Sequence, residues 1–263
     1  MNGPGGGPAE RPGGRPGRPA TGLDRFVVGT GRCGSTLLTR MLSLHRGLLG
    51  LHEVFTGLDW GTRFSPEPVT GAEVAAILAT PNRVIQLVTA RGHDAEEVTY
   101  PFRPTDRYRR GDPVPWMLTS TLGHLGDDPD AHWDRLAGWL SLRPRGPVAG
   151  HYRALFDHLA AEAGATAWVE RSGSSVDYVG DLLGCFAAAP GPDGAAVPAR
   201  VVHLHRDGAE VALSMRNHPF YRLAVQLSYG VLPEGVDPHD EDAVVDAWLE
   251  GTPPVALYGR GDL

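Results

Sequence analysis

The chain has 263 residues, and its 24 arginines and 31 acidic residues give a formal net charge of −7 at neutral pH. It contains no lysine, and its negative charge argues against general nucleic-acid binding, which needs a basic face. The length is enough for the core of one large α/β domain. One of the two cysteines, Cys33, lies in a glycine-rich loop, and the other, Cys185, lies in a predicted helix. We therefore expect no structural disulfide and a cytoplasmic location.

Residues 1–22 are dominated by glycine, proline and arginine. They lack the apolar side chains that a core needs, so we expect a disordered tail followed by a single domain at 23–263. The tail has no apolar run of the kind found in secretory signals. No stretch of the sequence approaches the ~20 apolar residues that a transmembrane helix needs, so we expect no membrane span.

Short apolar runs then alternate with stretches of helical periodicity. Strands are predicted at 25–29, 48–51, 166–170 and 201–204, and helices at 35–46, at 72–90 with a break at Pro81, at 130–142, at 147–164, at 175–188 and from Asp207 onward. This alternation predicts an α/β fold of three layers, with a central, mainly parallel sheet and helices on both of its faces. In such folds, ligands bind at the carboxyl ends of the strands. The loop-rich stretch 92–128 is expected to shape the substrate pocket.

The first predicted strand leads into a glycine-rich loop between Gly29 and Gly34, and a helix begins directly after it. Such a loop and the helix amino terminus hold phosphate or sulfate groups, because backbone N–H groups and the helix dipole attract negative charge. The spacing of the two glycines fits a nucleotide-binding P-loop, but Ser35 stands where the lysine belongs. A glycine turn without a ligand is the alternative. The predicted anion-binding residues are Gly31, Arg32, Cys33, Gly34, Ser35 and Thr36.

Two other predicted strands also end in an arginine. The strand at 166–170 is followed by Arg171, and the strand at 201–204 is followed by His205 and Arg206. Because the carboxyl ends of parallel strands lie at one edge of a sheet, we expect Arg32, Arg171 and Arg206 to lie close together. Three cations at one edge suit a ligand that carries several anionic groups.

With these stretches together, the chain resembles the sulfotransferases that use 3′-phosphoadenosine 5′-phosphosulfate (PAPS). The segment from Val28 to Leu38 is similar to that family's loop for the 5′-phosphosulfate. The segment from His205 to Ser214 is similar to its 3′-phosphate motif, with Arg206 at a strand end and Ser214 eight residues later. The resemblance covers residues 25–55 and 165–220, and it implies a P-loop-like fold in which Arg206 and Ser214 bind the 3′-phosphate.

The resemblance also implies a general base shortly after the first helix. Glu53 stands at the matching place, and the neighbouring His52 is the rival base. A base at this position takes the proton from the acceptor hydroxyl as its oxygen attacks sulfur. Arg171 stands where the family often has a lysine beside the transferring group, and an arginine there stabilises charge on the bridging oxygen.

The implied reaction transfers a sulfuryl group from PAPS to a hydroxyl or amine of a small-molecule acceptor, without a metal ion. Residues 92–128 are then an insertion on the acceptor side. The glycine-rich, basic segment that the family carries near its carboxyl terminus is not evident here, which leaves the adenine side of the site open. The oligomeric state and the identity of the acceptor do not follow from the sequence.

Three other functions are considered. A P-loop kinase or NTPase needs a lysine after Gly34 and an acidic residue for magnesium at a strand end, and the lysine is missing. A cysteine phosphatase with Cys33 as nucleophile would need an arginine at position 39, which is a threonine. A degenerate member that binds a nucleotide without catalysis stays open. For a metal site, His203 and His205 lack a third ligand in the sequence pattern.

Overall fold

The computed structural model describes most of the chain between residues 22 and 250. The described residues are 22–93, 97–191, 194–216, 218, 221 and 235–250. The predicted disorder of the amino-terminal tail therefore lies outside the described residues, apart from Gly22. The prediction of a single domain over 23–263 stays a prediction.

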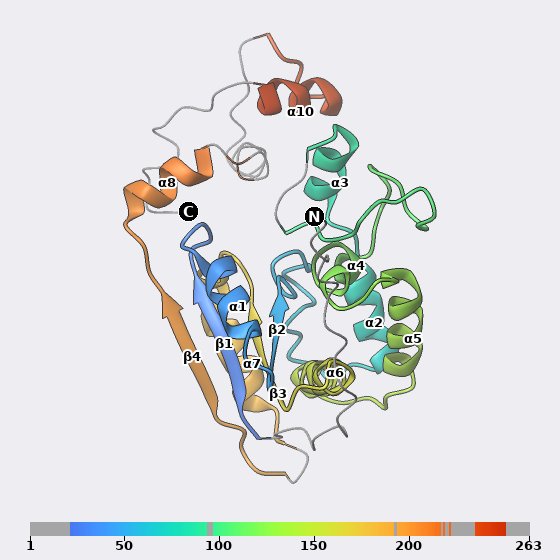
Figure 1. Ribbon diagram of the computed structural model, residues 1–263, viewed down its shortest axis with the longest axis vertical. Coiled ribbons are helices and arrows are strands. Elements are labelled where there is room, and N and C mark those ends of the chain that lie inside the picture. The colour runs from blue at the N-terminus through green and yellow to red at the C-terminus, as the bar shows by residue number, and fades with distance from the viewer. Residues whose placement is uncertain are drawn as a thin grey trace, which may run out of the picture.

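The described residues contain a central sheet of four parallel strands, in the order β2–β3–β1–β4 (Figure 1). The strands are β1 (Asp24–Gly29), β2 (Leu48–His52), β3 (Ala167–Arg171) and β4 (Ala199–Leu204). Their carboxyl ends share one edge because all four run in the same direction. The predicted α/β fold with a parallel sheet is confirmed.

The helices lie mostly where the periodicity places them. Before β3 come α1 (Ser35–Ser43), α2 (Gly71–Ala79), α3 (Arg83–Ala90), α4 (Trp116–Ser120), the 3₁₀ helix η1 (Leu122–His124), α5 (Pro129–Ser141) and α6 (Val148–Glu162). After β3 come the 3₁₀ helix η2 (Ser175–Tyr178), α7 (Val179–Ala188), α8 (Gly208–Arg216) and α10 (Glu241–Glu250). None of these described helices is long and apolar enough to cross a membrane.

Capping side chains explain two of the boundaries, and one predicted boundary is wrong. The predicted break at Pro81 separates α2, which begins with a capping box at Thr70, from α3, whose first turn is capped by Asn82. The first helix, predicted to end at residue 46, ends at Ser43. A tight turn ends it early, because the N–H group of Leu48 bonds to the carbonyl of His45 and sends the chain straight into β2.

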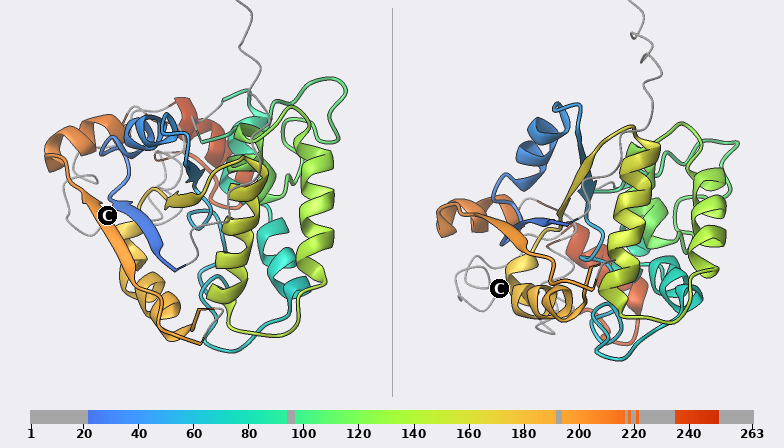
Figure 2. Two further views of the ribbon diagram at one scale, coloured as in Figure 1. Left: turned by 60° about the horizontal axis from the view of Figure 1, so that its bottom comes forward. Right: turned by 90° about the horizontal axis from the view of Figure 1, so that it is seen from below.

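Helices cover both faces of the sheet and complete the three layers. Gly50 of β2 faces α1, where an added Cβ would lie only 2.8 Å from Cγ2 of Thr39. Its neighbour Leu51 points the other way, into a core shared with Phe156 of α6 and Phe186 of α7. Figure 2 shows α1 and α7 on opposite sides of the strands. The sheet is thus packed on both sides beneath its carboxyl edge.

A second group of helices, α2, α4 and α5, packs beside α6 and extends the same core. Within the predicted loop-rich stretch 92–128, residues 97–115 have no helix or strand, but residues 116–124 form α4 and η1, so that part of the prediction is wrong. The loop at 97–115 is fixed to α5 by Tyr100, whose hydroxyl donates to Asp130 at 2.8 Å, and by an ion pair between Arg107 and Asp134. This loop therefore leads Trp116 into the core in a defined position.

Candidate functional site

A cavity of about 280 Å³ opens at the carboxyl edge of the sheet, beside the amino end of α1. Residues from every predicted motif line it: Gly31, Arg32, Gly34, Ser35, Thr36, Glu53, Arg171, Arg206 and Ser214. His52 and Cys33 are the two predicted site residues that do not line it. The three arginines that were predicted to meet at one edge of the sheet do so.

The glycine-rich loop adopts left-handed backbone at three positions, with φ of +75° at Gly31, +48° at Arg32 and +94° at Gly34. Gly34 is the N-cap of α1 and offers no capping side chain, so the first N–H groups of the helix stay available to an anion. Cys33 is buried, and its Sγ packs so closely against Gly29 that a Cβ added to this glycine would lie 2.7 Å from the sulfur. Cys33 therefore packs under the loop.

The two motifs that are far apart in the sequence meet at this loop. The Nε of Arg32 donates to Oγ of Ser214 at 3.1 Å, and Arg206 donates to the carbonyl oxygen of Arg32 at 3.2 Å. Arg206 also forms an ion pair with Glu210 at 2.9 Å. The side chain of Asp207 accepts the N–H groups of Ala209 and Glu210 and so caps the first turn of α8. The start of α8 is thus fixed beside the start of α1.

Glu53 and Arg171 form a buried ion pair at the centre of the carboxyl edge. Both side chains are 3% exposed. The Glu53 carboxylate also accepts the N–H group of Gly173 at 2.7 Å and the hydroxyl of Thr56 at 2.5 Å. Its backbone is left-handed, with φ of +54°. A non-glycine residue in this region stores strain that the surrounding contacts must hold, and such strain is common at functional sites.

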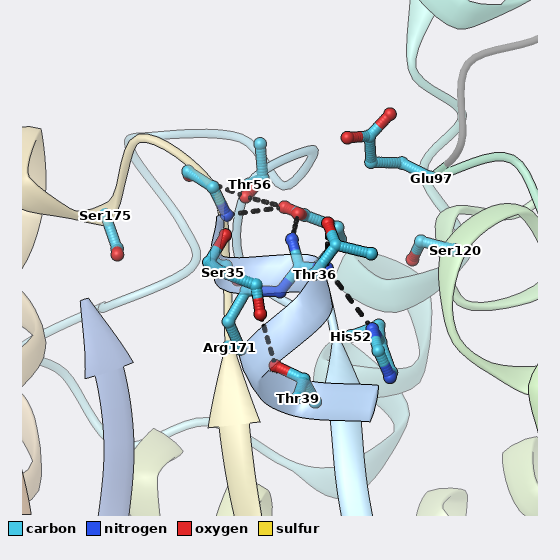
Figure 3. A network of polar contacts seen from close by, with 12 residues as sticks. Ser35, Thr36, Thr39, His52, Thr56, Glu97, Ser120, Arg171 and Ser175 are labelled. Carbon is cyan, nitrogen blue, oxygen red and sulfur yellow. Dashed lines mark hydrogen bonds and ion pairs between the residues drawn. The ribbon is translucent and has the colours of Figure 1, made fainter. Parts of the chain in front are cut away.

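Arg171 links this carboxylate to α1 and to His52 (Figure 3). Its second amino group lies 3.1 Å from the hydroxyl of Thr36 and 3.2 Å from Nδ1 of His52. Burial lowers the pKa of Arg171 to about 10. Burial, followed by the charge of Arg171, lowers the pKa of His52 to about 3. His52 is therefore neutral at physiological pH, and its Nδ1 lone pair faces Arg171.

Sequence reasoning missed several residues of this site. Trp116 lines the cavity, and its indole N–H donates to the carbonyl oxygen of Glu53 at 2.7 Å. Thr56, Glu97 and Tyr221 also line the cavity, and no motif marks them. Thr56 follows Glu53 by three residues in a turn that apolar periodicity cannot describe. Within the described residues, no three His, Cys, Asp or Glu side chains gather closely enough to hold a metal ion.

The comparisons with known proteins give one distant similarity. No protein-family model matches the chain, and no curated protein matches its sequence. Its structure is similar to the sulfotransferase domain from the Synechococcus PCC 7002 olefin synthase, with 14% sequence identity and a TM-score of 0.37. The similarity covers 83% of this chain and 65% of that domain. A likeness this distant carries no functional weight, so a function has to be inferred from the residues of the cavity.

Proposed function

We propose that the protein transfers a sulfuryl group from PAPS to a hydroxyl or amine of a small-molecule acceptor. One observation carries this proposal. Arg32 of the glycine-rich loop and Ser214 of α8, 182 residues apart, are hydrogen-bonded at the amino end of α1, and Arg206 joins them. A site with several cationic and N–H donors suits a ligand with anionic groups at both its 5′ and 3′ positions.

The donors of the cavity fit such a ligand. An arginine has five N–H donors. Arg206 uses one on Glu210 and one on the Arg32 carbonyl, so others remain for a phosphate. Ser214 accepts from Arg32, which leaves its own hydroxyl hydrogen to donate. In this proposal Arg206 and Ser214 bind the 3′-phosphate, while Ser35, Thr36 and the helix amino end bind the 5′-phosphosulfate.

In the proposed reaction Glu53 is the general base. The acceptor oxygen forms a bond to sulfur, the bond between sulfur and the bridging phosphate oxygen breaks, and Glu53 takes the acceptor proton. The products are the sulfated acceptor and 3′-phosphoadenosine 5′-phosphate. Glu53 suits the role because its carboxyl group lines the cavity and the donors around it hold its position.

Arg171 connects Glu53 to the bridging oxygen between sulfur and phosphate. As Glu53 gains the proton, its charge disappears and its attraction to Arg171 weakens. Arg171 is then free to donate to the bridging oxygen, on which negative charge develops. His52 fits the role of base less well, because it lies outside the cavity lining and its pKa is about 3. Its place beside Arg171 suits a residue that orients the guanidinium.

Calorimetry with three nucleotides tests the binding half of this proposal. We expect 3′-phosphoadenosine 5′-phosphate to bind much more tightly than AMP, because Arg206 and Ser214 contact only a 3′-phosphate. ATP with magnesium tests the kinase alternative. We expect it to bind weakly, because the glycine-rich loop of this protein has no lysine. Equal affinity for AMP and 3′-phosphoadenosine 5′-phosphate would remove the basis of the proposal.

Mass spectrometry tests the catalytic half. The protein is incubated with PAPS and a panel of phenols, sugars, amines and alcohols, and each acceptor is searched for an added sulfuryl group. The slow transfer to water, followed as release of 3′-phosphoadenosine 5′-phosphate, gives a rate that needs no known acceptor. Tight nucleotide binding without either reaction would identify a non-catalytic nucleotide-binding protein.

A further inference from the structure

The turn after β2 presents Glu53 to the cavity and is held from several directions. Its carbonyl oxygens accept from two side chains: Trp116 donates to the oxygens of Glu53 and Val54, and Arg63 donates to that of Phe55 at 3.1 Å. The N–H group of Glu53 bonds to the carbonyl of Arg171 at 2.7 Å. The remaining N–H groups of the turn, at Val54 and Phe55, need partners because both residues are fully buried.

The partner of Phe55 is Ser172, which connects the turn to Glu170, the strand residue directly before Arg171. The N–H group of Phe55 donates to Oγ of Ser172 at 3.0 Å, and Ser172 donates to Oε1 of Glu170 at 2.5 Å. The N–H groups of Val54 and Phe55 also lie close enough to the Glu170 carboxyl group to lower its pKa, against the larger effect of burial. The side chain of Glu170 is thus linked to the backbone of the turn through Ser172, and the function proposed above gives it no role.

Neighbouring residues of a strand point to opposite faces of the sheet. Arg171 therefore reaches the Glu53 carboxylate from the side of α1, where it also contacts Thr36. Glu170 and Ser172 reach the backbone of the same turn from the opposite side. The end of β3 holds the turn from both faces, through the side chain of Glu53 on one and through main-chain N–H groups on the other.

Glu170 is an unusual residue for this position. It is 1% exposed, and the strand residues opposite it are the apolar Phe26 and Leu51. No ion pair of Glu170 occurs among the described residues, and burial raises its pKa to about 8. The titratable groups around it are Tyr178 of η2 and, farther along the same contacts, Arg63, Glu53 and Arg171. At neutral pH Glu170 is mainly a neutral acid held by hydrogen bonds.

We propose that Glu170 is a positioning residue, which fixes the turn that presents Glu53. It accepts the hydroxyl of Ser172, whose Oγ in turn accepts the N–H group of Phe55. The proposal rests on the function proposed above in so far as Glu53 is the base. Glu170 touches neither the glycine-rich loop nor Arg206, so it acts on the transfer step and not on nucleotide binding. Ionising it leaves a buried charge without a counter-ion, which loosens the turn.

Two substitutions separate hydrogen bonding from charge. Glu170→Gln keeps an amide oxygen that can accept the hydroxyl of Ser172, but it cannot ionise. Glu170→Ala removes both the acceptor and the ionisable group. Asp157→Asn is the control, because burial also raises the pKa of the half-buried Asp157. Asp157 accepts the indole N–H group of Trp168 at 2.9 Å and does not line the cavity. Three quantities are measured: affinity for 3′-phosphoadenosine 5′-phosphate, transfer to water, and hydrogen exchange of residues 52–58 by mass spectrometry.

At pH 7 we expect Glu170→Ala to lower the transfer rate roughly 10²-fold and to speed exchange of residues 52–58, with nucleotide affinity unchanged within about threefold. Glu170→Gln should match the wild type at pH 7. Above pH 8 the wild type should lose transfer rate and exchange protection that Glu170→Gln keeps. Asp157→Asn should leave all three quantities unchanged.

Some outcomes would overturn the positioning role. One is hydrogen exchange of residues 52–58 at the wild-type rate in Glu170→Ala. The others are losses of transfer rate and exchange protection that are as large in Glu170→Gln at pH 7, or in Asp157→Asn, as in Glu170→Ala. Failure of the proposed function looks different, since the wild type would then neither bind 3′-phosphoadenosine 5′-phosphate nor release it from PAPS. In that case the exchange measurements still decide whether Glu170 holds the turn.

Discussion

Two buried arginine–carboxylate pairs stand at opposite ends of the sheet. Arg153 and Asp24 form one at the amino end of β1, and Arg171 and Glu53 form the other at the carboxyl edge. Arg153 uses all five of its N–H donors: three bonds go to Asp24, and the rest go to main-chain carbonyl oxygens at the end of α7 and just after it. Asp24 lies in an ordinary strand. This pair has every donor satisfied, and it lines a different cavity, of about 430 Å³, at the amino end of β1.

The Arg171 pair differs in its donors, its backbone and the cavity that it lines. Among the described residues, the buried Nε of Arg171 has no hydrogen-bond partner, and Glu53 has left-handed backbone. Both residues line the cavity at the carboxyl edge of the sheet. A buried ion pair with unsatisfied donors is poor evidence for a stabilising role. We propose from this comparison that the Arg153 pair holds the fold together, whereas the Arg171 pair keeps donors and a carboxylate ready for a reacting group.

The largest expected effect is on catalysis. Glu53→Gln removes the proton acceptor but keeps the size and most hydrogen bonds of the side chain. We expect transfer to water to fall about 10²–10⁴-fold, the usual contribution of a general base, while nucleotide affinity stays within about threefold. Asp24→Asn, the matching change in the other pair, should leave the rate of the folded protein unchanged. Unchanged turnover in Glu53→Gln would assign the proton to His52 or to another group.

The second effect is on stability. Arg153→Met leaves Asp24 buried without its counter-ion, and we expect the free energy of unfolding to fall by about 3–5 kcal/mol. Arg171→Met should cost less than half of that, because Glu53 keeps the N–H group of Gly173 and the hydroxyl of Thr56 and faces the cavity. Urea denaturation at pH 7 measures both. Equal losses would show that the two pairs do not differ in their structural role.

The third effect is on the pH dependence of stability and concerns Glu170. This buried carboxyl group has no ion-pair partner among the described residues. Between its unfolded pKa near 4.5 and its folded pKa of about 8, the native protein holds a proton that the unfolded chain has released. The free energy of unfolding therefore falls as pH rises through this window, by at most about 1.4 kcal/mol per pH unit. Below pH 4.5 the stabilisation is fully present.

Urea denaturation of the wild type and Glu170→Gln from pH 4 to pH 9 measures this difference. The free energy of unfolding of the wild type should fall between pH 4.5 and pH 8, and that of Glu170→Gln should not. The variant therefore becomes more stable relative to the wild type as pH rises toward 8. The lowered pKa of His52 acts in the opposite direction, because it makes the protein less stable as pH falls below 6.5, and it affects both proteins equally. Parallel curves for the two proteins would contradict the assignment.

The fourth effect is on nucleotide binding. Arg206→Ala removes the proposed contact to the 3′-phosphate, and we expect 3′-phosphoadenosine 5′-phosphate to bind about 1.5–3 kcal/mol more weakly. The affinity for AMP should not change, because AMP has no 3′-phosphate. Arg145→Ala is the control, since Arg145 is an exposed arginine paired with Glu73 away from the cavity. Calorimetry that finds equal losses for AMP would place Arg206 at the 5′ end.

Much of the fold could be predicted from the sequence, because it depends on local patterns. Apolar runs gave the strands, 3.6-residue periodicity gave the helices, and the glycine spacing gave the loop. The early end of α1 was missed because it depends on a turn at His45. That Arg32, Arg171 and Arg206 line one cavity followed from the parallel sheet alone.

The contacts within the site could not be predicted in the same way. The ion pair between Glu53 and Arg171 depends on β2 and β3 being neighbours, with His52 opposite Arg171, although the strands are more than 100 residues apart. A single sequence does not reveal this register. The alternation of β3 places Glu170 on one face, but it does not show that a carboxyl group there is linked to a turn through Ser172. Such contacts depend on tertiary packing.

The smallest expected effect concerns a third pair, between Arg206 and Glu210, whose side chains are 41% and 60% exposed. Exposed pairs contribute about 0–1 kcal/mol to stability, so Glu210→Gln should change the free energy of unfolding by less than about 0.5 kcal/mol. Its effect on binding should be opposite to that of Arg206→Ala. Glu210 competes with a phosphate for the same guanidinium, and its removal should tighten binding of 3′-phosphoadenosine 5′-phosphate roughly two- to fivefold.

This gain should disappear at 1 M salt, where screening acts over only about 3 Å. The control is Glu73→Gln, which changes an exposed carboxylate paired with Arg145 and should not alter nucleotide affinity. Weaker binding in Glu210→Gln would mean that Glu210 orients Arg206 toward the ligand. Glu210 would then act on Arg206 as Glu53 acts on Arg171, by holding the guanidinium in place. A phosphate would bind beside Glu210 and would not replace it.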